Sequence, residues 1–127
     1  MCDVALGLQE QGLREFAATV NASFMDQWVD LGLYDEEEES WGRAFEQVIT
    51  KTIACGGRIH FNLVGLDITA ALQGDPEVWV HGHTAWELRQ IVRNSTWFAN
   101  TLFYLDGMVL SADEVVAIGI ATSKKSV

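Results

Sequence analysis

The spacing of the apolar residues changes at Gly56-Gly57, and this change constrains the fold more than any other feature of the sequence. Before it, apolar residues recur every three or four positions, in one stripe over Leu13–Leu31 and another over Trp41–Thr52. This is the spacing of one helix face. After it, apolar and polar residues alternate over Arg58–Leu63, as in a strand with one buried face. The sequence therefore predicts an α+β domain, in which two N-terminal helices pack on a small, mainly antiparallel sheet with short connecting helices.

The two predicted N-terminal helices have identifiable ends. Gly32 follows the first stripe and suits a helix carboxyl terminus. The acidic run Asp35–Glu39 precedes the second stripe, and carboxylates are favoured where a helix begins because its first N–H groups are unpaired. Gly56-Gly57 ends the second helix. Residues 1–55 therefore form the helical, acidic part of a single domain over 1–127.

Residues 56–120 are predicted to form a strand, connecting helices and a hairpin. We expect a short helix over Asp67–Leu72 and a loop over residues 77–83. Thr101–Leu105 reads as a strand, and Asp106-Gly107 is a strong signal for a two-residue turn. Met108–Leu110 should then return antiparallel to that strand.

Two segments have the S/T-x-x-E pattern of a capping box, in which a hydroxyl and a carboxylate satisfy each other's backbone N–H groups. The first is Thr84 with Glu87, and the second is Ser111 with Glu114. Each pair predicts the beginning of a helix.

The net charge of −10 is unevenly distributed. Residues 1–54 carry eleven acidic and three basic residues, whereas residues 55–127 carry seven and five. The chain therefore lacks the broad basic surface of a protein that binds nucleic acid tightly over its whole face. A single phosphate site remains compatible with this composition, because it needs only two or three local cations.

The chain has two cysteines, Cys2 and Cys55, which do not form a CxxC pair. We expect two unpaired thiols in a reducing compartment, with Cys2 in a fraying terminus. No apolar run approaches the roughly 20 residues that span a bilayer, and the N-terminus lacks the pattern of a secretory signal. No membrane role is predicted.

The three histidines are the first candidates for chemistry. His60 shares the polar face of its strand with Asn62, and this face is either solvated or the floor of a site. An imidazole titrates near neutral pH and can act as an acid or a base. His81 and His83 lie in a predicted loop and could serve the same purpose. With His60 they could also hold zinc, but no cysteine or carboxylate at a suitable spacing completes the set. We therefore predict no metal and no cofactor.

Two arginines and two strand residues are further candidates. Arg89 and Arg93 are four residues apart on one helix face and could bind a phosphate, or pair with Glu87 or a surface acid. Thr101 and Tyr104 point to opposite faces of one strand, so at most one of them can share a site with His60. The Tyr104 hydroxyl is a usable donor, although a buried aromatic residue is the simpler interpretation.

Three segments of the second part resemble a known family. GGRIHFNLVGLDITAAL, TAWELRQIVRN and NTLFYLDG together look like a C-terminal toxin domain of bacterial polymorphic toxins of the Rhs and contact-dependent-inhibition type, over roughly residues 56–110. Many such domains are nucleases, so the resemblance implies a nuclease that acts in the cytoplasm and has a cognate immunity protein. The order of helices followed by strands is also similar to barnase-like ribonucleases, which is an analogy of fold only. The polar positions of the toxin pattern fall on His60, Glu87, Arg89, Thr101 and Tyr104.

Two functions remain open from the sequence. The first is a toxin-type effector that cleaves RNA by histidine acid–base chemistry, with His60, His81 or His83 as acid and base and Arg89 stabilising the phosphate. Asn62, Arg93, Thr101 and Tyr104 would then bind the substrate. The second is a non-catalytic, acidic protein-binding module, such as an inhibitor, an immunity protein or an adaptor, that uses the charge of residues 1–54.

Overall fold

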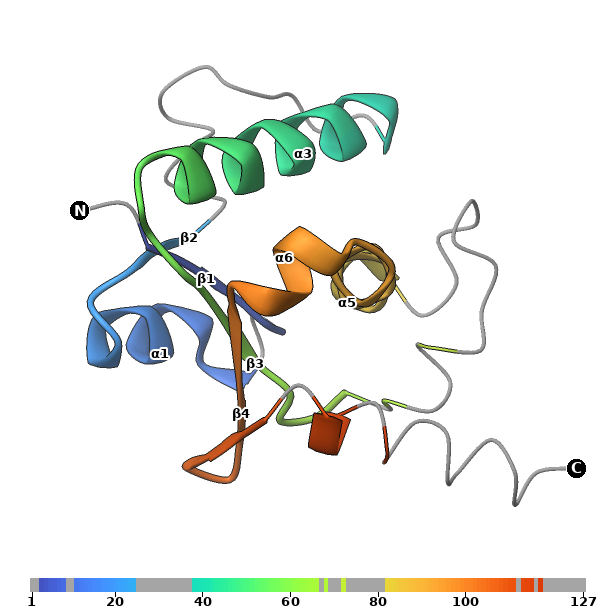
Figure 1. The fold of residues 1–127 in the computed structure, drawn as a ribbon. Helices are drawn as coiled ribbons and strands as arrows, with labels where there is room; N and C mark the ends of the chain where they lie inside the picture. The colour runs from blue at the N-terminus through green and yellow to red at the C-terminus, as the bar shows by residue number, and fades with distance from the viewer. Residues whose placement is uncertain are drawn as a thin grey trace, which may run out of the picture.

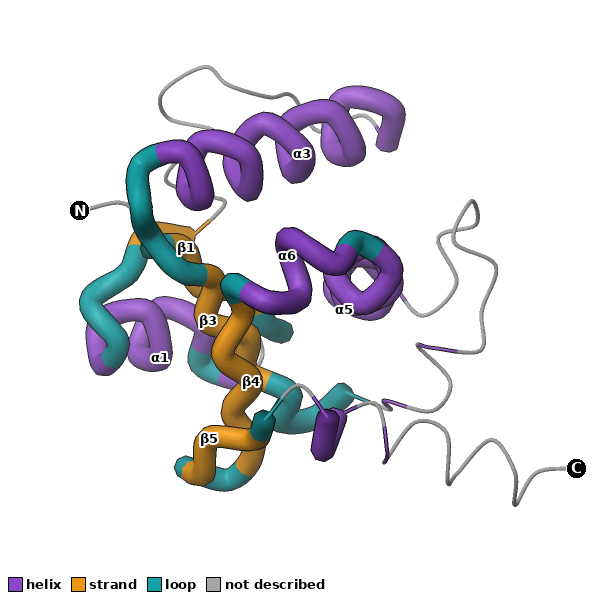
Figure 2. Tube along the Cα trace, viewed as in Figure 1, coloured by secondary structure: helices purple, strands orange, loops and turns teal. Residues whose placement is uncertain are grey.

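The computed structural model describes residues 3–8, 11–24, 38–66, 68, 72, 82–111, 113–115 and 117 (Figure 1). It contains helices and a five-stranded mixed sheet, which confirms the α+β class (Figure 2). The elements are, in chain order, β1 (Val4–Leu6), α1 (Leu13–Thr19), β2 (Ser23–Phe24), α3 (Glu38–Ala54), β3 (Ile59–Asn62), α5 (Gly82–Arg93), α6 (Ser95–Ala99), β4 (Thr101–Leu105) and β5 (Met108–Leu110).

The strands of the sheet lie in the order β2-β1-β3-β4-β5. β1 runs parallel to both β2 and β3, and β3 runs parallel to β4. Only β4 and β5 are antiparallel. The prediction of a mainly antiparallel sheet was therefore wrong, and the analogy with barnase-like ribonucleases loses its basis. Long connections that carry helices return the chain to the same end of the sheet, and only the short turn after β4 reverses it.

Helices cover both faces of the sheet. The chain steps from β1 to β2 in one direction and from β2 to β3 in the other. Because crossovers between parallel strands are right-handed, the connecting helices then lie on opposite faces. Figure 1 shows α1 on one side and α3, α5 and α6 on the other. Both N-terminal helices contact the sheet as predicted, but they do not share a face.

The larger core lies between the sheet and the helices α3 and α5. From α3, the predicted buried face is confirmed at Phe45, Val48 and Ile49, each with 0 % exposure. Phe45 packs edge-to-face against two indoles, with ring centroids 5.5 Å from Trp86 and 5.9 Å from Trp97. A smaller cluster on the other face joins Ala5, Leu13 and Ala17.

The N-terminal strand β1 lies inside the sheet, between β2 and β3, and the sequence did not predict it. Val4 and Ala5 are fully buried and Leu6 is 2 % exposed. A parallel strand covered on both faces is apolar at every position, so it shows no alternation. Three such residues beside a chain terminus carry no distinctive signal, and we expected a fraying end here.

The first predicted helix ends earlier than its apolar stripe. α1 stops at Thr19, Asn21 adopts a positive φ of 58°, and Phe24 belongs to β2. The stripe from Leu13 was therefore wrong as one helix, because its member Phe24 pairs with Ala5 of β1. The remainder of the stripe, the Gly32 terminus, and most of the predicted Asp67–Leu72 helix lie outside the described residues.

The local turn and cap predictions had mixed outcomes. Asp106 and Gly107 have φ of 51° and 79°, as a two-residue hairpin turn requires. In the Ser111 capping box, the Ser111 Oγ accepts from the Glu114 N–H at 3.1 Å, and Glu114 Oε1 accepts from the Ser111 N–H at 3.4 Å. The Thr84 capping box was wrong: α5 already begins at Gly82, and the Thr84 hydroxyl donates to the Gly7 carbonyl at 3.3 Å.

Two further expectations concern the cysteines and the membrane. Cys55 is disulfide-bonded, so the expectation of unpaired thiols was wrong. Among the helices of the described residues, none has the length and apolarity that a membrane span needs.

Gly7 marks a close approach between the ends of β1 and β3. Its φ is 156°, and a methyl group placed on its Cα would lie 3.2 Å from both the Cβ and the carbonyl oxygen of Asn62.

Since a backbone oxygen in a sheet cannot move aside, we expect Gly7→Ala to lower the free energy of unfolding by roughly 1–3 kcal/mol, measured by urea denaturation. Gly42→Ala is the control: it lies within α3 and its added methyl would meet Trp86 at an ordinary 3.6 Å. That change should be neutral or stabilise the protein by up to about 1 kcal/mol, and equal losses for both would contradict the crowding argument.

Candidate functional site

Three adjacent strands bring together a hydrogen-bonded chain of Asp3, His60 and Tyr104. The His60 Nε2 lies 2.7 Å from the Asp3 Oδ2, and its Nδ1 lies 2.8 Å from the Tyr104 hydroxyl. Asp3 directly precedes β1, His60 is in β3 and Tyr104 is in β4. We call this chain the Asp–His–Tyr relay.

The strand register explains why the three side chains meet. His60 pairs with Ala5 of β1, and Tyr104 pairs with Asn62 of β3. Because side chains alternate along a strand, Asp3 shares the face of Ala5, and His60 shares the face of Asn62. This is the face that α1 covers. His60 is only 7 % exposed, so the interpretation of this face as solvated was wrong.

The chemistry of the partners fixes the direction of each hydrogen bond when the imidazole is neutral. A carboxylate can only accept, so the His60 Nε2–H donates to Asp3. The Nδ1 is then an acceptor, and the Tyr104 hydroxyl donates to it. The relay therefore holds one imidazole tautomer, with its basic nitrogen directed at Tyr104.

Asp3 is held as a carboxylate. Its hydrogen bond from His60 lowers the pKa of the carboxyl group, and the backbone N–H of Arg58, 3.0 Å from the Oδ1, lowers it further against the opposing effect of burial. The Asp3 side chain is 33 % exposed. Both of its oxygens thus have protein partners, and the charge is available to stabilise a protonated His60.

Tyr104 is positioned by two rings. Phe16 of α1 meets it edge-to-face at 5.0 Å between centroids, and His60 stacks on it at 5.8 Å. Burial raises the pKa of the Tyr104 hydroxyl, and the charge of Asp3 raises it further, whereas the charge of Arg58 lowers it. Tyr104 therefore remains a neutral donor near pH 7.

Arg58 supplies a cation beside the relay. Its side chain is exposed, and its positive charge lowers the pKa of both Asp3 and Tyr104. The backbone of Arg58 is anchored to the relay, since its N–H donates to the Asp3 Oδ1 at 3.0 Å. The alternation over Arg58–Leu63 puts Arg58 on the face of His60 but gives it no role, and no sequence pattern identified Asp3. Asp3 could have been recognised as a candidate from its position directly before a short apolar run.

Arg89 does not share the site of His60. It belongs to α5, which packs on the other face of the sheet, and it is 1 % exposed. The sheet itself therefore lies between the two residues. The proposal that Arg89 stabilises a phosphate beside His60 was wrong for this reason.

Asn62 and Thr101 have structural partners. The Asn62 Oδ1 accepts from the backbone N–H of Val64 at 3.1 Å, which closes the turn after β3. The Thr101 hydroxyl donates to the Trp97 carbonyl at 2.7 Å, on the face away from His60. Of the two β4 candidates, only Tyr104 shares the face of His60, as the alternation required.

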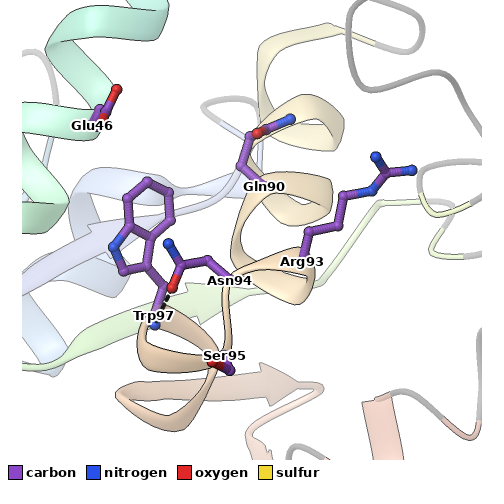
Figure 3. A pocket seen from close by; sticks show the side chains of 6 residues that line it. All are labelled: Glu46, Gln90, Arg93, Asn94, Ser95 and Trp97. Carbon is purple, nitrogen blue, oxygen red and sulfur yellow. Dashed lines mark hydrogen bonds between the residues drawn. The ribbon is translucent and has the colours of Figure 1, made fainter.

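Arg93 lies at a separate pocket, which is formed where α3, α5 and α6 meet on the face of the sheet opposite α1. The pocket has a volume of about 520 Å³. Figure 3 shows Glu46 on α3 at one side of the pocket and Gln90 on α5 at the other, while the Arg93 side chain points away from Trp97. The Asn94 side chain at its floor accepts from the Trp97 N–H at 3.1 Å and so caps α6. Arg93 is therefore remote from the relay. The pocket is lined by Glu46, Gln90, Arg93, Asn94, Ser95 and Trp97.

His81 and the side chain of His83 lie outside the described residues, so their part in the site stays a prediction. Within the described ranges, no three or more His, Cys, Asp or Glu residues are grouped so that they could hold a metal ion.

No protein-family model, curated protein or solved structure matches the chain. The geometry of the relay is therefore the basis for a functional proposal.

Glu87 is a buried acid on α5 that the relay does not use. It is 3 % exposed, its Oε2 has no hydrogen-bond partner, and burial raises the pKa of the carboxyl group from 4.5 to about 8. The folded protein therefore binds a proton here that the unfolded chain releases above pH 4.5. This contribution to stability is complete below that pH and is lost as the pH rises toward 8.

Glu87→Gln should remove this pH dependence, since glutamine resembles the protonated acid but does not ionise. We expect the variant to gain roughly 4 kcal/mol of unfolding free energy over the native protein at pH 8, and much less at pH 5. Urea denaturation at both pH values measures the effect. Glu46→Gln, at an exposed position of α3, is the control and should change stability by less than about 0.5 kcal/mol at either pH. A loss of stability in Glu87→Gln that is equal at both pH values would contradict the assignment.

Proposed function

We propose that the protein is a toxin-type effector domain that cleaves RNA by histidine acid–base chemistry centred on His60. The observation that supports this most is the Asp–His–Tyr relay, with bonds of 2.7 and 2.8 Å on either side of one imidazole. A carboxylate that fixes the tautomer of a histidine and stabilises its protonated form is a common arrangement for a general base.

RNA suits such a site because it carries its own nucleophile. When the ribose 2′-hydroxyl loses its proton to a base, its oxygen can attack the adjacent phosphorus and expel the 5′-oxygen. The protein then needs a base, a cation for the phosphate and a means to protonate the leaving group. His60 provides the base, and the exposed Arg58, in place of the buried Arg89, provides the cation.

The resemblance to polymorphic toxin domains supports the same function. On this proposal the domain acts in the bacterial cytoplasm, where RNA is accessible, and a cognate immunity protein is its partner. His81 and His83 remain candidates for the acid that protonates the leaving oxygen.

The acidic binding module is the alternative function. The exposed charged residues in the described part of α3 are Arg43, Glu46 and Lys51, which are mixed in sign and give this function no specific support. If the acidic run is the binding surface, neutralising Glu36–Glu39 should abolish salt-sensitive capture of a partner in a pull-down. Unchanged capture would contradict the alternative.

Incubation of the purified protein with tRNA and total RNA tests the proposed function. His60→Asn keeps hydrogen-bonding groups but cannot act as a base, so we expect the cleavage rate to fall about 10²–10⁴-fold. Arg58→Ala should reduce it about 10- to 100-fold through loss of a charge-assisted contact. Lys51→Ala, which removes an exposed cation from α3 on the other face of the sheet, should leave the rate unchanged.

An oligonucleotide with a single 2′-deoxyribose at the cleavage position tests the nucleophile. We expect this oligonucleotide to resist cleavage there, because the attacking oxygen is missing. Intact RNA at high protein concentration, without growth arrest when the protein is expressed in bacteria, would overturn the proposal.

A further inference from the structure

The environment of His60 leaves no ring nitrogen open to a substrate. The Nε2 is bonded to Asp3 and the Nδ1 to Tyr104, and the side chain is 8 % exposed. A base must come within hydrogen-bond distance of the proton that it removes. His60 can therefore exchange a proton with an RNA hydroxyl only through one of its two partners.

Asp3 is not suited to pass the proton on. Its two oxygens accept from the His60 ring and from the Arg58 backbone, and both bonds favour the ionised carboxylate. A group that stays ionised stabilises the charge of its neighbour but does not carry a proton.

Tyr104 has the required properties. Its hydroxyl is bonded directly to the basic Nδ1, its side chain is only half-buried, and a phenol can donate one hydrogen bond while it accepts another. Phe16 holds its ring at 5.0 Å between centroids.

We propose that Tyr104 is the residue that exchanges the proton with the RNA 2′-hydroxyl, and that His60 acts through it. The inference rests on the proposed function and deepens it. The 2′-hydroxyl gives its proton to the Tyr104 oxygen while Tyr104 gives its own proton to the His60 Nδ1. The 2′-oxygen forms its bond to phosphorus, and the bond from phosphorus to the 5′-oxygen breaks.

The charges balance over a complete cycle. Asp3 stabilises the protonated His60 while the 5′-oxygen leaves with a proton from the general acid, which solvent then reprotonates. His60 then returns its proton to solvent through Tyr104, which restores the neutral relay. Tyr104 is thus a catalytic residue, whereas Asp3 is a positioning residue.

Tyr104→Phe tests the inference with little disturbance of the packing, because phenylalanine keeps the ring against Phe16. We expect the kcat for RNA to fall at least 100-fold, with a change in KM below about threefold, because the lost hydroxyl acts in the chemical step. The double variant His60→Asn with Tyr104→Phe should be no slower than the slower single variant, since the two residues act as one unit. Tyr34→Phe makes the same chemical change at the other tyrosine of the chain and should leave kcat unchanged.

Changing the acidity of the Tyr104 phenol distinguishes a catalytic role of this residue from a purely structural one. In the Tyr34→Phe background, Tyr104 is the only tyrosine, so growth on 3-fluorotyrosine places fluorine on it alone. Fluorine acidifies the phenol, and an ionised Tyr104 has no proton for His60. The alkaline limb of the pH–kcat profile should therefore move to lower pH, which a purely structural role would not cause.

The outcomes separate the two proposals. If the native protein cleaves RNA and His60→Asn is inactive, but Tyr104→Phe keeps more than a third of the rate, the role of Tyr104 is overturned and the proposed function stands. An unmoved alkaline limb with fluorotyrosine also overturns the role of Tyr104. If the native protein leaves RNA intact, the proposed function and the catalytic role of Tyr104 both fail.

Discussion

Pairing of β1 with strands on both of its sides holds the sheet together. Val4 lies opposite Ser23 on one side and Ile59 on the other, so three buried residues connect the first helix of the chain to the part that follows Gly57. Without β1, the strands β2 and β3 have no common neighbour, and the clusters on the two faces lose the layer between them. Both faces of β1 are buried, so every residue of this strand is apolar.

The candidate site depends on the same strand. Asp3 is the first described residue of the chain, and the pairing of β1 with β3 places its carboxylate 2.7 Å from His60. The imidazole is then oriented by one neighbouring strand and contacted by Tyr104 from the other. A polar group that is only 7 % exposed needs partners of this kind. The backbone geometry of the sheet therefore explains both the burial of His60 and the direction of its basic nitrogen.

Much of the local structure could be predicted from the sequence. The buried face of α3, the strand of His60, the Asp106-Gly107 turn and the Ser111 cap all depend on residues a few positions apart, and such signals can be read along the chain. The alternation of side chains in β4 also indicated that at most one of Thr101 and Tyr104 could share a site with His60. The Thr84 pattern failed because a tertiary bond to Gly7 took the hydroxyl, and tertiary contacts override local preferences.

The parallel pairing and the role of Asp3 could not be predicted in the same way. Asp3 and His60 are 57 positions apart, and no periodic pattern links them. The short apolar run after Asp3 is equally compatible with a frayed end, a turn of helix or a strand. Arg89 was assigned to the site because its charge and helix position were visible, whereas the sheet that separates it from His60 was not. The sequence thus indicated which types of residue form the site, but which of them lie together depends on the topology of the sheet.

The order of the strands also has a consequence for how the chain reaches its folded state. β1 is made first, but its partner Ile59 follows 55 positions after Val4, and β4 comes more than 40 positions later still. Contacts so distant along the chain close slowly, because a long loop must lose its freedom before they form. During synthesis, the apolar segment Val4–Leu6 therefore has no β3 to pair with until some fifty further residues have been made. The relay that gives His60 its chemistry needs all three of β1, β3 and β4, so the activity that we propose cannot begin before Tyr104 has been made and β4 has paired with β3.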